Sequence, residues 1–133
     1  MSSKSHFISV VDDEADLAYL YKEALRVIDG VDVFAFTDPH LALEHFQNNY
    51  RNYKCVITDF RMPSMNGAQL LEKVKDVNPE VKRILISAFE IHDDLFKDCQ
   101  SIDKFLPKPI TMSELIEVVQ KHVNKVEIRQ NSC

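Results

Sequence analysis

The stretch KCVITDFRMPSMNGAQLLEKVKDVNPEVKRILIS, residues 54–87, decides the fold. It begins with a short apolar run at 54–58 and ends with a second one at 82–87, both of strand length. Between the runs, apolar residues recur at helical spacing, namely Leu70, Leu71, Val74 and Val77. Asn78 and Pro79 end this helix, because the residue before a proline is pushed out of the helical region. A helix between two strands predicts a unit of a parallel sheet.

The same alternation continues on both sides of this unit. Further strands are predicted at 7–11, 31–36 and 104–106. One helix carries apolar residues from Leu17 to Ile28, and Asp38 and Pro39 open another as N-cap and first helical residue. A less regular helix is expected at about 91–100, and Thr111 with Glu114 forms a capping box before the last one, which is expected to end at Val126. The fold class is therefore α/β: a doubly wound (βα)5 fold, with a five-stranded parallel sheet and five helices.

Length and composition limit the function. A chain of 133 residues predicts one domain, residues 1–126, with a short tail at 127–133. No apolar run approaches the roughly 20 residues of a membrane helix. Only two glycines are present, Gly30 and Gly67, so neither a Rossmann fingerprint nor a Walker phosphate loop is available. Gly67 is expected to let the chain turn into the following helix without a Cβ clash.

Charge and cysteine usage indicate the setting. The net charge of −5 argues against direct nucleic-acid binding and against binding to anionic membranes. An odd number of widely spaced cysteines and an N-terminus without a long apolar stretch predict a reducing, cytoplasmic location. The five histidines have no metal-ligand spacing with a cysteine and are expected on the surface or on helix faces: His6, His40, His45, His92 and His122.

Polar residues lie where the predicted strands end. Asp12 and Asp13 follow the first strand, Asp59 follows the third, Ser87 ends the fourth and Lys108 follows the fifth. Parallel strands bring their carboxyl ends to one edge, where ligands bind in sheets of this class. Three carboxylates there would repel one another and raise each other's pKa values unless a cation joined them, and such oxygen ligands suit Mg²⁺. Beside the metal, Lys108 and the Ser87 hydroxyl would receive a phosphoryl group, with Asp59 as the nucleophile.

Four motifs carry a family resemblance. They are VVDDE at 10–14, TDFRMPSMNG at 58–67, ISA at 86–88 and FLPKPI at 105–110, in this order along the chain. With them the sequence resembles the receiver domain of two-component response regulators, in the stand-alone form of a chemotaxis regulator, from about His6 to Val126. The resemblance implies a flavodoxin-like sheet with strand order 2-1-3-4-5.

The resemblance also implies the function and the role of each residue. Asp59 would accept phosphoryl from a histidine kinase, a phosphotransfer histidine or a small acyl phosphate. Asp13 would bind Mg²⁺ directly and Asp12 through water, with Asp59 and the Arg61 backbone carbonyl as further ligands. Ser87 and Lys108 would bind the phosphoryl oxygens.

The resemblance further implies a switch and its partners. Ser87 and Phe105 would repack the surface of the fourth helix, fifth strand and fifth helix, where a downstream protein or a second copy would bind. Beyond self-phosphorylation and self-dephosphorylation, no enzymatic activity is expected. Arg61 and Phe89 would flank the phosphoryl group and slow its hydrolysis.

Three alternatives remain. A metal-dependent phosphohydrolase of the haloacid dehalogenase kind also uses an Asp nucleophile, but it requires a second Asp two residues later, where this chain has Arg61. A flavodoxin-like cofactor binder requires a hydroxyl-rich phosphate loop after the first strand, where this chain has acidic residues. A receiver-like module could also bind partners without phosphorylation.

Overall fold

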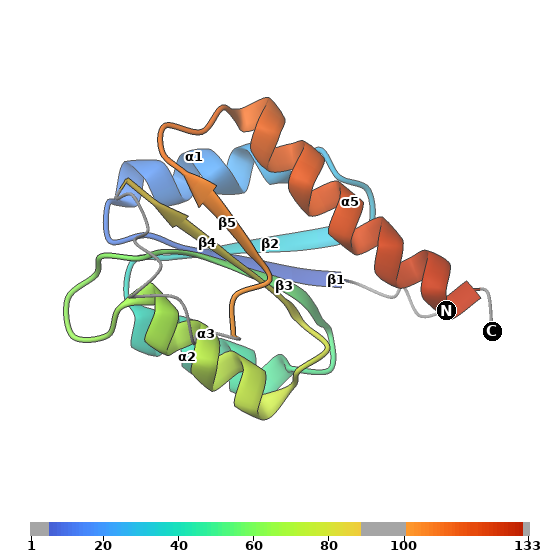
Figure 1. Ribbon diagram of the computed structural model, residues 1–133, viewed down its shortest axis with the longest axis horizontal. Coiled ribbons are helices and arrows are strands. Elements are labelled where there is room, and N and C mark those ends of the chain that lie inside the picture. Colours follow the sequence, from blue (N-terminus) through green and yellow to red (C-terminus); the bar gives the residue numbers. More distant parts are fainter. Residues whose placement is uncertain (1–5, 89–100, 132–133) are drawn as a thin grey trace.

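Five parallel strands form one sheet in the computed structural model, which describes residues 6–88 and 101–131 (Figure 1). The strands are β1 (His6–Val11), β2 (Val31–Phe36), β3 (Tyr53–Asp59), β4 (Lys82–Ser87) and β5 (Lys104–Pro107). Their order in the sheet is β2-β1-β3-β4-β5, and every neighbouring pair is parallel. The predicted fold class and strand order are confirmed.

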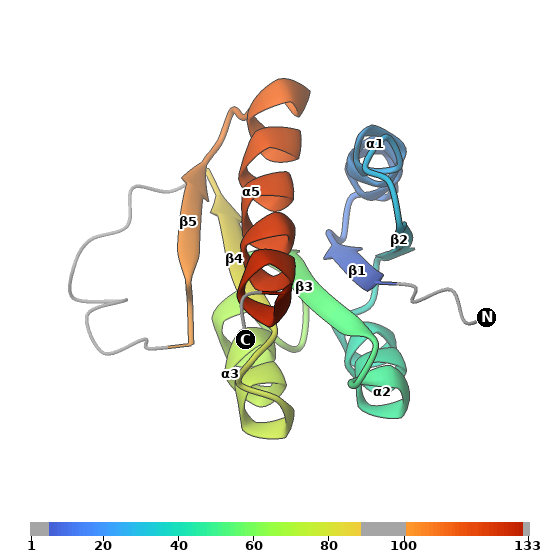
Figure 2. The same cartoon turned by 90° about the vertical axis from the view of Figure 1, so that its right-hand side faces the viewer.

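Helices cover both faces of the sheet. They are α1 (Ala15–Leu25), α2 (Pro39–Asn49), α3 (Gly67–Val77) and α5 (Met112–Asn131). Helices α1 and α5 lie on one face and α2 and α3 on the other (Figures 1 and 2). The helix predicted at 91–100 falls outside the described residues. Within the part of the chain that is described, none of the helices combines the length and apolar character of a membrane span.

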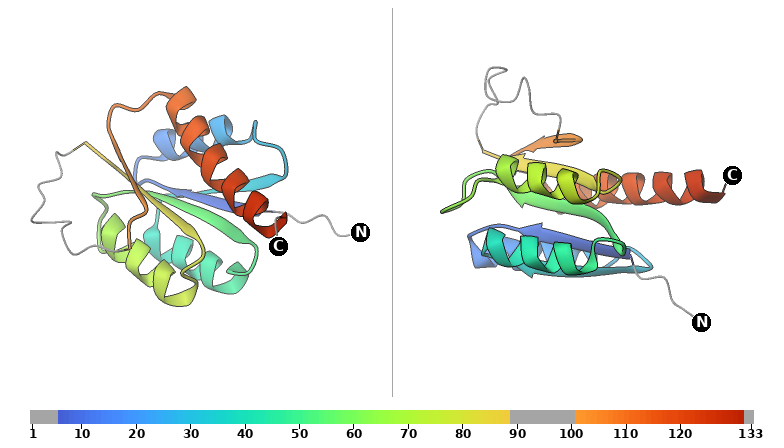
Figure 3. Two further views of the ribbon diagram at one scale, coloured as in Figure 1. Left: turned by 45° about the vertical axis from the view of Figure 1, so that its right-hand side comes forward. Right: turned by 90° about the horizontal axis from the view of Figure 1, so that it is seen from below.

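The last helix is longer than the sequence indicated. Its predicted end was Val126, with a frayed tail from 127, but α5 continues to Asn131. The capping box at its start is confirmed, since Glu114 N donates to Thr111 Oγ1 at 3.1 Å and Thr111 N donates to Glu114 Oε1 at 2.9 Å. Residues 127–131 contain neither glycine nor proline, so no helix-breaking residue ends the helix at Val126. Its C-terminal end extends beyond the strands (Figure 3).

Two apolar cores fill the space between the sheet and the helices. The alternation of side chains along β1 assigns Ile8 and Val10 to the core under α1 and α5, and Phe7 and Val11 to the core under α2 and α3. Strands buried on both faces explain the near-continuous apolar runs in the sequence. The polar ends of the strands are thereby held on a rigid support.

A buried arginine fixes the chain before β5. The Arg83 side chain is only 6% exposed, and its guanidinium donates to the Ser101 carbonyl at 2.7 Å and to the Val81 carbonyl at 2.8 Å. It also lies 3.5 Å from the Asp103 carboxylate. These contacts anchor residues 101–103 to β4, directly before the strand that leads to Lys108.

One histidine is more buried than the sequence indicated. His45 lies on α2 and is half-buried against the sheet, with its Nδ1 atom 2.7 Å from Tyr53 Oη. Its ring is surrounded by the rings of Phe7, Phe34 and Phe36, at centroid distances of 6.0, 4.4 and 5.5 Å. Burial lowers the pKa of His45, because the charged imidazolium loses hydration there.

Candidate functional site

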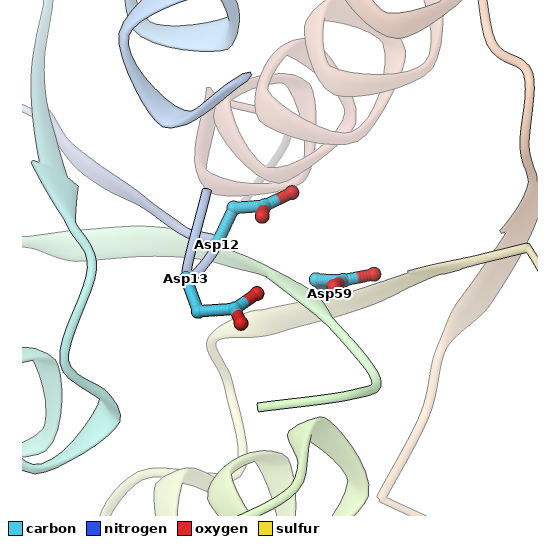
Figure 4. Close-up of side chains that lie close together, drawn as sticks. All are labelled: Asp12, Asp13 and Asp59. Atoms are coloured by element: carbon cyan, nitrogen blue, oxygen red, sulfur yellow. The ribbon is translucent and has the colours of Figure 1, made fainter. Parts of the chain in front are cut away.

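Three carboxylates meet at the carboxyl ends of two neighbouring strands. Asp12 and Asp13 follow β1, and Asp59 is the last residue of β3. The two strands pair in parallel with Val11 opposite Thr58, so the chain places the acids side by side. Each carboxylate offers one oxygen to the cluster, and these three oxygens all lie within 4.8 Å of one another. Figure 4 shows Asp12 and Asp13 beside Asp59. Close carboxylates repel one another, so the arrangement favours a cation.

Asp12 is fully buried, with 0% exposure. Its Oδ1 atom accepts a hydrogen bond from Glu14 N at 2.9 Å. Its Oδ2 atom has no hydrogen-bond partner among the described residues, although Lys108 Nζ lies 3.6 Å away. A buried carboxylate oxygen without a hydrogen bond is costly, and a bound cation or its water would satisfy it.

Lys108 is shared between two acids. Its Nζ atom lies 3.3 Å from Asp59 Oδ1 and 3.6 Å from Asp12 Oδ2. The residue follows β5, and its backbone N donates to the Ser87 carbonyl at 2.8 Å. The peptide bond between Lys108 and Pro109 is cis. The ends of β4 and β5 therefore bring the lysine across to the acids of β1 and β3.

The charges perturb each other's protonation. Burial raises the pKa of Asp12 and of Asp59, and the nearby lysine partly opposes this in both cases. Burial lowers the pKa of Lys108, but the Asp12 and Asp59 carboxylates outweigh burial, so its net pKa lies above the usual value. Lys108 therefore remains a cation at neutral pH, in position to meet an anionic group.

The loop from Phe60 to Asn66 follows Asp59 and leads to α3. Phe60 N donates to the Ile86 carbonyl at 3.1 Å, and Gly67 N donates to the Phe60 carbonyl at 2.8 Å. A Cβ atom on Gly67 would overlap the Asp59 carbonyl oxygen, so the expected backbone role of this glycine is confirmed. Arg61 is exposed on the same loop.

The two predicted switch residues lie on neighbouring strands. Ser87 ends β4 and is buried, and Phe105 lies on β5 opposite Leu85 and is half-buried against the core under α3. Phe89 is outside the described residues. The structure thus gathers Asp12, Asp13, Asp59 and Lys108 into one cluster, places Ser87 beside Lys108 through the backbone, and leaves Phe105 within the sheet.

Two structural supports of the site were missed in the sequence. Asn66 and Gln69 form a capping box at the start of α3, because Gln69 N donates to Asn66 Oδ1 at 2.8 Å and Asn66 N donates to Gln69 Oε1 at 2.9 Å. The spacing of Asn66 and Gln69 could have revealed this box. The contacts of Arg83 with Ser101 and Asp103 join residues 18 and 20 positions apart, so no local pattern in the sequence predicts them.

Known proteins resemble this chain in sequence along most of its length. The family model of the response regulator receiver domain matches residues 8–120. Response regulator RppA of Synechocystis is 26% identical over 114 residues, covering 82% of this chain and 47% of that protein. The DNA-binding transcriptional regulator NtrC of Escherichia coli is 26% identical over 125 residues, covering 91% of this chain and 25% of that protein. The chain thus spans less than half the length of either relative.

Solved structures show the same fold. A response regulator receiver domain protein from Clostridium thermocellum has a TM-score of 0.82 and 25% identity, covering 92% of this chain and 98% of that one. The receiver domain of the Francisella response regulator 1452 has a TM-score of 0.75 and 27% identity, covering 90% of this chain and 98% of that one.

Proposed function

The chain belongs to the response regulator receiver family, and from that premise we propose that it is a Mg²⁺-dependent phosphoacceptor of two-component signalling, with Asp59 as the phosphorylated residue. The observation that carries the proposal is the cluster at the strand ends. Asp59 lies within 4.8 Å of two further acids and 3.3 Å from an ammonium group. A nucleophilic carboxylate, a cation site and a positive charge for the incoming oxygens are the parts that phosphoryl transfer needs.

The residues present fit a hard divalent cation. Three carboxylates supply oxygen donors of the kind Mg²⁺ prefers, and one of these oxygens, Asp12 Oδ2, is buried without a hydrogen bond from the described part of the chain. Asp13, Asp59 and the Arg61 carbonyl would hold the ion directly, and Asp12 would hold its waters. When bound, Mg²⁺ would neutralise phosphoryl oxygens during transfer.

The transfer itself is carried by the chain's own groups. An Asp59 carboxylate oxygen attacks the phosphorus of a phosphohistidine, a P–O bond forms, and the P–N bond breaks as its electron pair returns to the imidazole. Lys108 and the Ser87 hydroxyl bind the phosphoryl oxygens as their charge shifts. The histidine donor belongs to a histidine kinase or a histidine phosphotransfer protein.

The output is a changed protein surface. Ser87 and Phe105 would move together after phosphorylation and repack the face formed by the fourth helix, β5 and α5. A downstream protein target would read this face, and a second copy of the chain could bind there too. In this proposal the protein catalyses only its own phosphorylation and dephosphorylation in the cytoplasm.

Intact-mass measurement after incubation with acetyl phosphate and Mg²⁺ tests the proposal. We expect a gain of one phosphoryl group, which Asp59→Asn and a metal chelator should each abolish. Glu44→Gln on the exposed side of α2 serves as a control that should keep the gain. No gain with acetyl phosphate or with a panel of phosphorylated histidine kinases, in a folded protein, would favour a binding module that acts without phosphorylation.

A further inference from the structure

The first residues of α2 contact the loop that follows Asp59. His40 Nε2 lies 3.1 Å from Ser64 Oγ, within hydrogen-bond distance, although the two residues are 24 positions apart. Neither contact atom belongs to the acidic cluster. The pair therefore links the helix on one side of the sheet to the loop beside the site.

The helix holds His40 in a defined place. Asp38 is the N-cap and accepts a hydrogen bond from His40 N at 2.8 Å, and Pro39 occupies the first helical position. A capped first turn with a fixed proline φ leaves little backbone freedom. His40 can therefore serve as a fixed point for Ser64.

The middle of the loop requires a contact, such as the one with His40, that holds it in place. Its ends are held by Phe60 N, which donates to the Ile86 carbonyl, and by Gly67 N, which donates to the Phe60 carbonyl. Between them, Ser64 has a φ of 69°, in the left-handed region that residues with a Cβ rarely adopt. Without a partner for its side chain, Ser64 would be free to leave this conformation and shift the neighbouring residues.

We propose that His40 is a positioning residue for the metal site: by holding Ser64 it fixes the loop that carries the Arg61 carbonyl. The inference rests on the proposed function, because that carbonyl is a ligand only if the acids hold Mg²⁺. In this proposal His40 touches neither the metal nor the phosphoryl group, and it acts through the backbone that joins Ser64 to Arg61.

Mg²⁺ titration of the 133-residue chain by calorimetry tests the proposal. His40→Ala should weaken Mg²⁺ binding by about two- to tenfold, the range that corresponds to one net hydrogen bond. Ser64→Ala should do the same, and the double variant should be no weaker than either single one, because both remove the same contact. His40→Gln, whose amide can also reach Ser64, should restore part of the affinity.

A second readout separates positioning from general damage. In phosphorylation by acetyl phosphate, the Mg²⁺ concentration for half-maximal rate should rise in His40→Ala, while the rate at saturating Mg²⁺ should match wild type. Leu41→Ala is the matched control, since Leu41 is the next residue on α2 and is 54% exposed. This variant should bind Mg²⁺ as wild type does.

The inference would be overturned by wild-type Mg²⁺ affinity in His40→Ala, or by losses in the single variants that add in the double variant. An equal loss in Leu41→Ala would also overturn it, since the effect would then belong to the helix as a whole. Absence of Mg²⁺ binding in the wild-type protein is a different failure, which refutes the proposed metal site and this inference together.

Discussion

The two glycines of the chain offer a matched test of how the fold positions Asp59. At Gly67, a Cβ atom would overlap the Asp59 carbonyl oxygen and come within 2.7 Å of Leu85 Cδ1. Leu85 is fully buried, so its side chain has little room to withdraw. In Gly67→Ala, α3 and the end of β3 must therefore move apart.

The cost follows from the size of this overlap. Inserting one methyl group into packed surroundings destabilises a protein by about 1–3 kcal/mol. For 133 residues the unfolding entropy is about 0.28 kcal/mol/K, so Tm should fall by about 4–11 °C. A displacement of Asp59 on the order of 1 Å should slow phosphorylation by about 100-fold.

Gly30→Ala is the control. Gly30 has a φ of +82°, but a Cβ atom there meets nothing within 4 Å. The substitution should cost about 1–2 kcal/mol from backbone conformation alone, which lowers Tm by about 4–7 °C. Gly30 precedes the first residue of β2, whereas Asp59 is the last residue of β3, so the two residues lie at opposite ends of the parallel strands. The phosphorylation rate of Gly30→Ala should therefore be unchanged.

Circular dichroism during thermal unfolding gives the Tm of each variant. Incorporation of phosphoryl from acetyl phosphate, followed at 25 °C where both variants are folded, gives the phosphorylation rate. The reasoning fails if Gly67→Ala is phosphorylated at the wild-type rate. It also fails if Gly30→Ala is slowed to the same degree, because lost stability alone would then explain the effect.

Three further predictions follow from other parts of the structure. Arg83→Leu should lower the free energy of unfolding, measured in urea, by about 2–4 kcal/mol, because buried carbonyls lose their donor. The control Arg26→Leu removes an exposed ion pair and should change the free energy of unfolding by less than about 0.5 kcal/mol. Burial lowers the pKa of His45 below 6.5, so protonation favours the unfolded chain and the free energy of unfolding should fall as the pH drops below 6.5. Urea unfolding of wild type and His45→Gln at several pH values measures this loss as a change in the difference between the two proteins. A difference that stays constant with pH would refute the prediction. Replacing both Arg61 and Phe89 by Ala should shorten the phosphoryl lifetime followed by intact mass, and equal lifetimes would show that the two side chains do not hinder water.

Local patterns in the sequence were sufficient to predict most of the fold. Apolar runs of strand length and the helical spacing between them predicted every described strand, and Thr111 and Glu114 marked the start of α5. The predicted end of α5 was five residues too early, because residues 127–131 contain no glycine or proline that would end the helix. Burial of one face and continuation of a helix are separate properties, and hydrophobic periodicity reports only the first.

The cluster of acids was predictable because the topology of the sheet determines where the ends of the strands lie. Once the strands are parallel, Asp12 and Asp59 must come to one edge whatever their separation in sequence. The contacts of Arg83, the ring environment of His45 and the link between His40 and Ser64 have no such rule behind them. They depend on side chains that meet only after the layers have packed.

The charge balance of the site indicates how a phosphoryl group on Asp59 would act there. With three ionised carboxylates and one ammonium group the cluster carries a net charge of −2, and burial makes that excess costly, as the raised pKa values of Asp12 and Asp59 indicate. A divalent cation would cancel it. Transfer to Asp59 would then bring new anionic oxygens to a lysine that lies 3.6 Å from Asp12 and 3.3 Å from Asp59. Lys108 is shared between two acids, so under the proposed function a change in charge on Asp59 would shift the lysine between them. The end of β4 would then respond first, because the Lys108 backbone N donates to the Ser87 carbonyl.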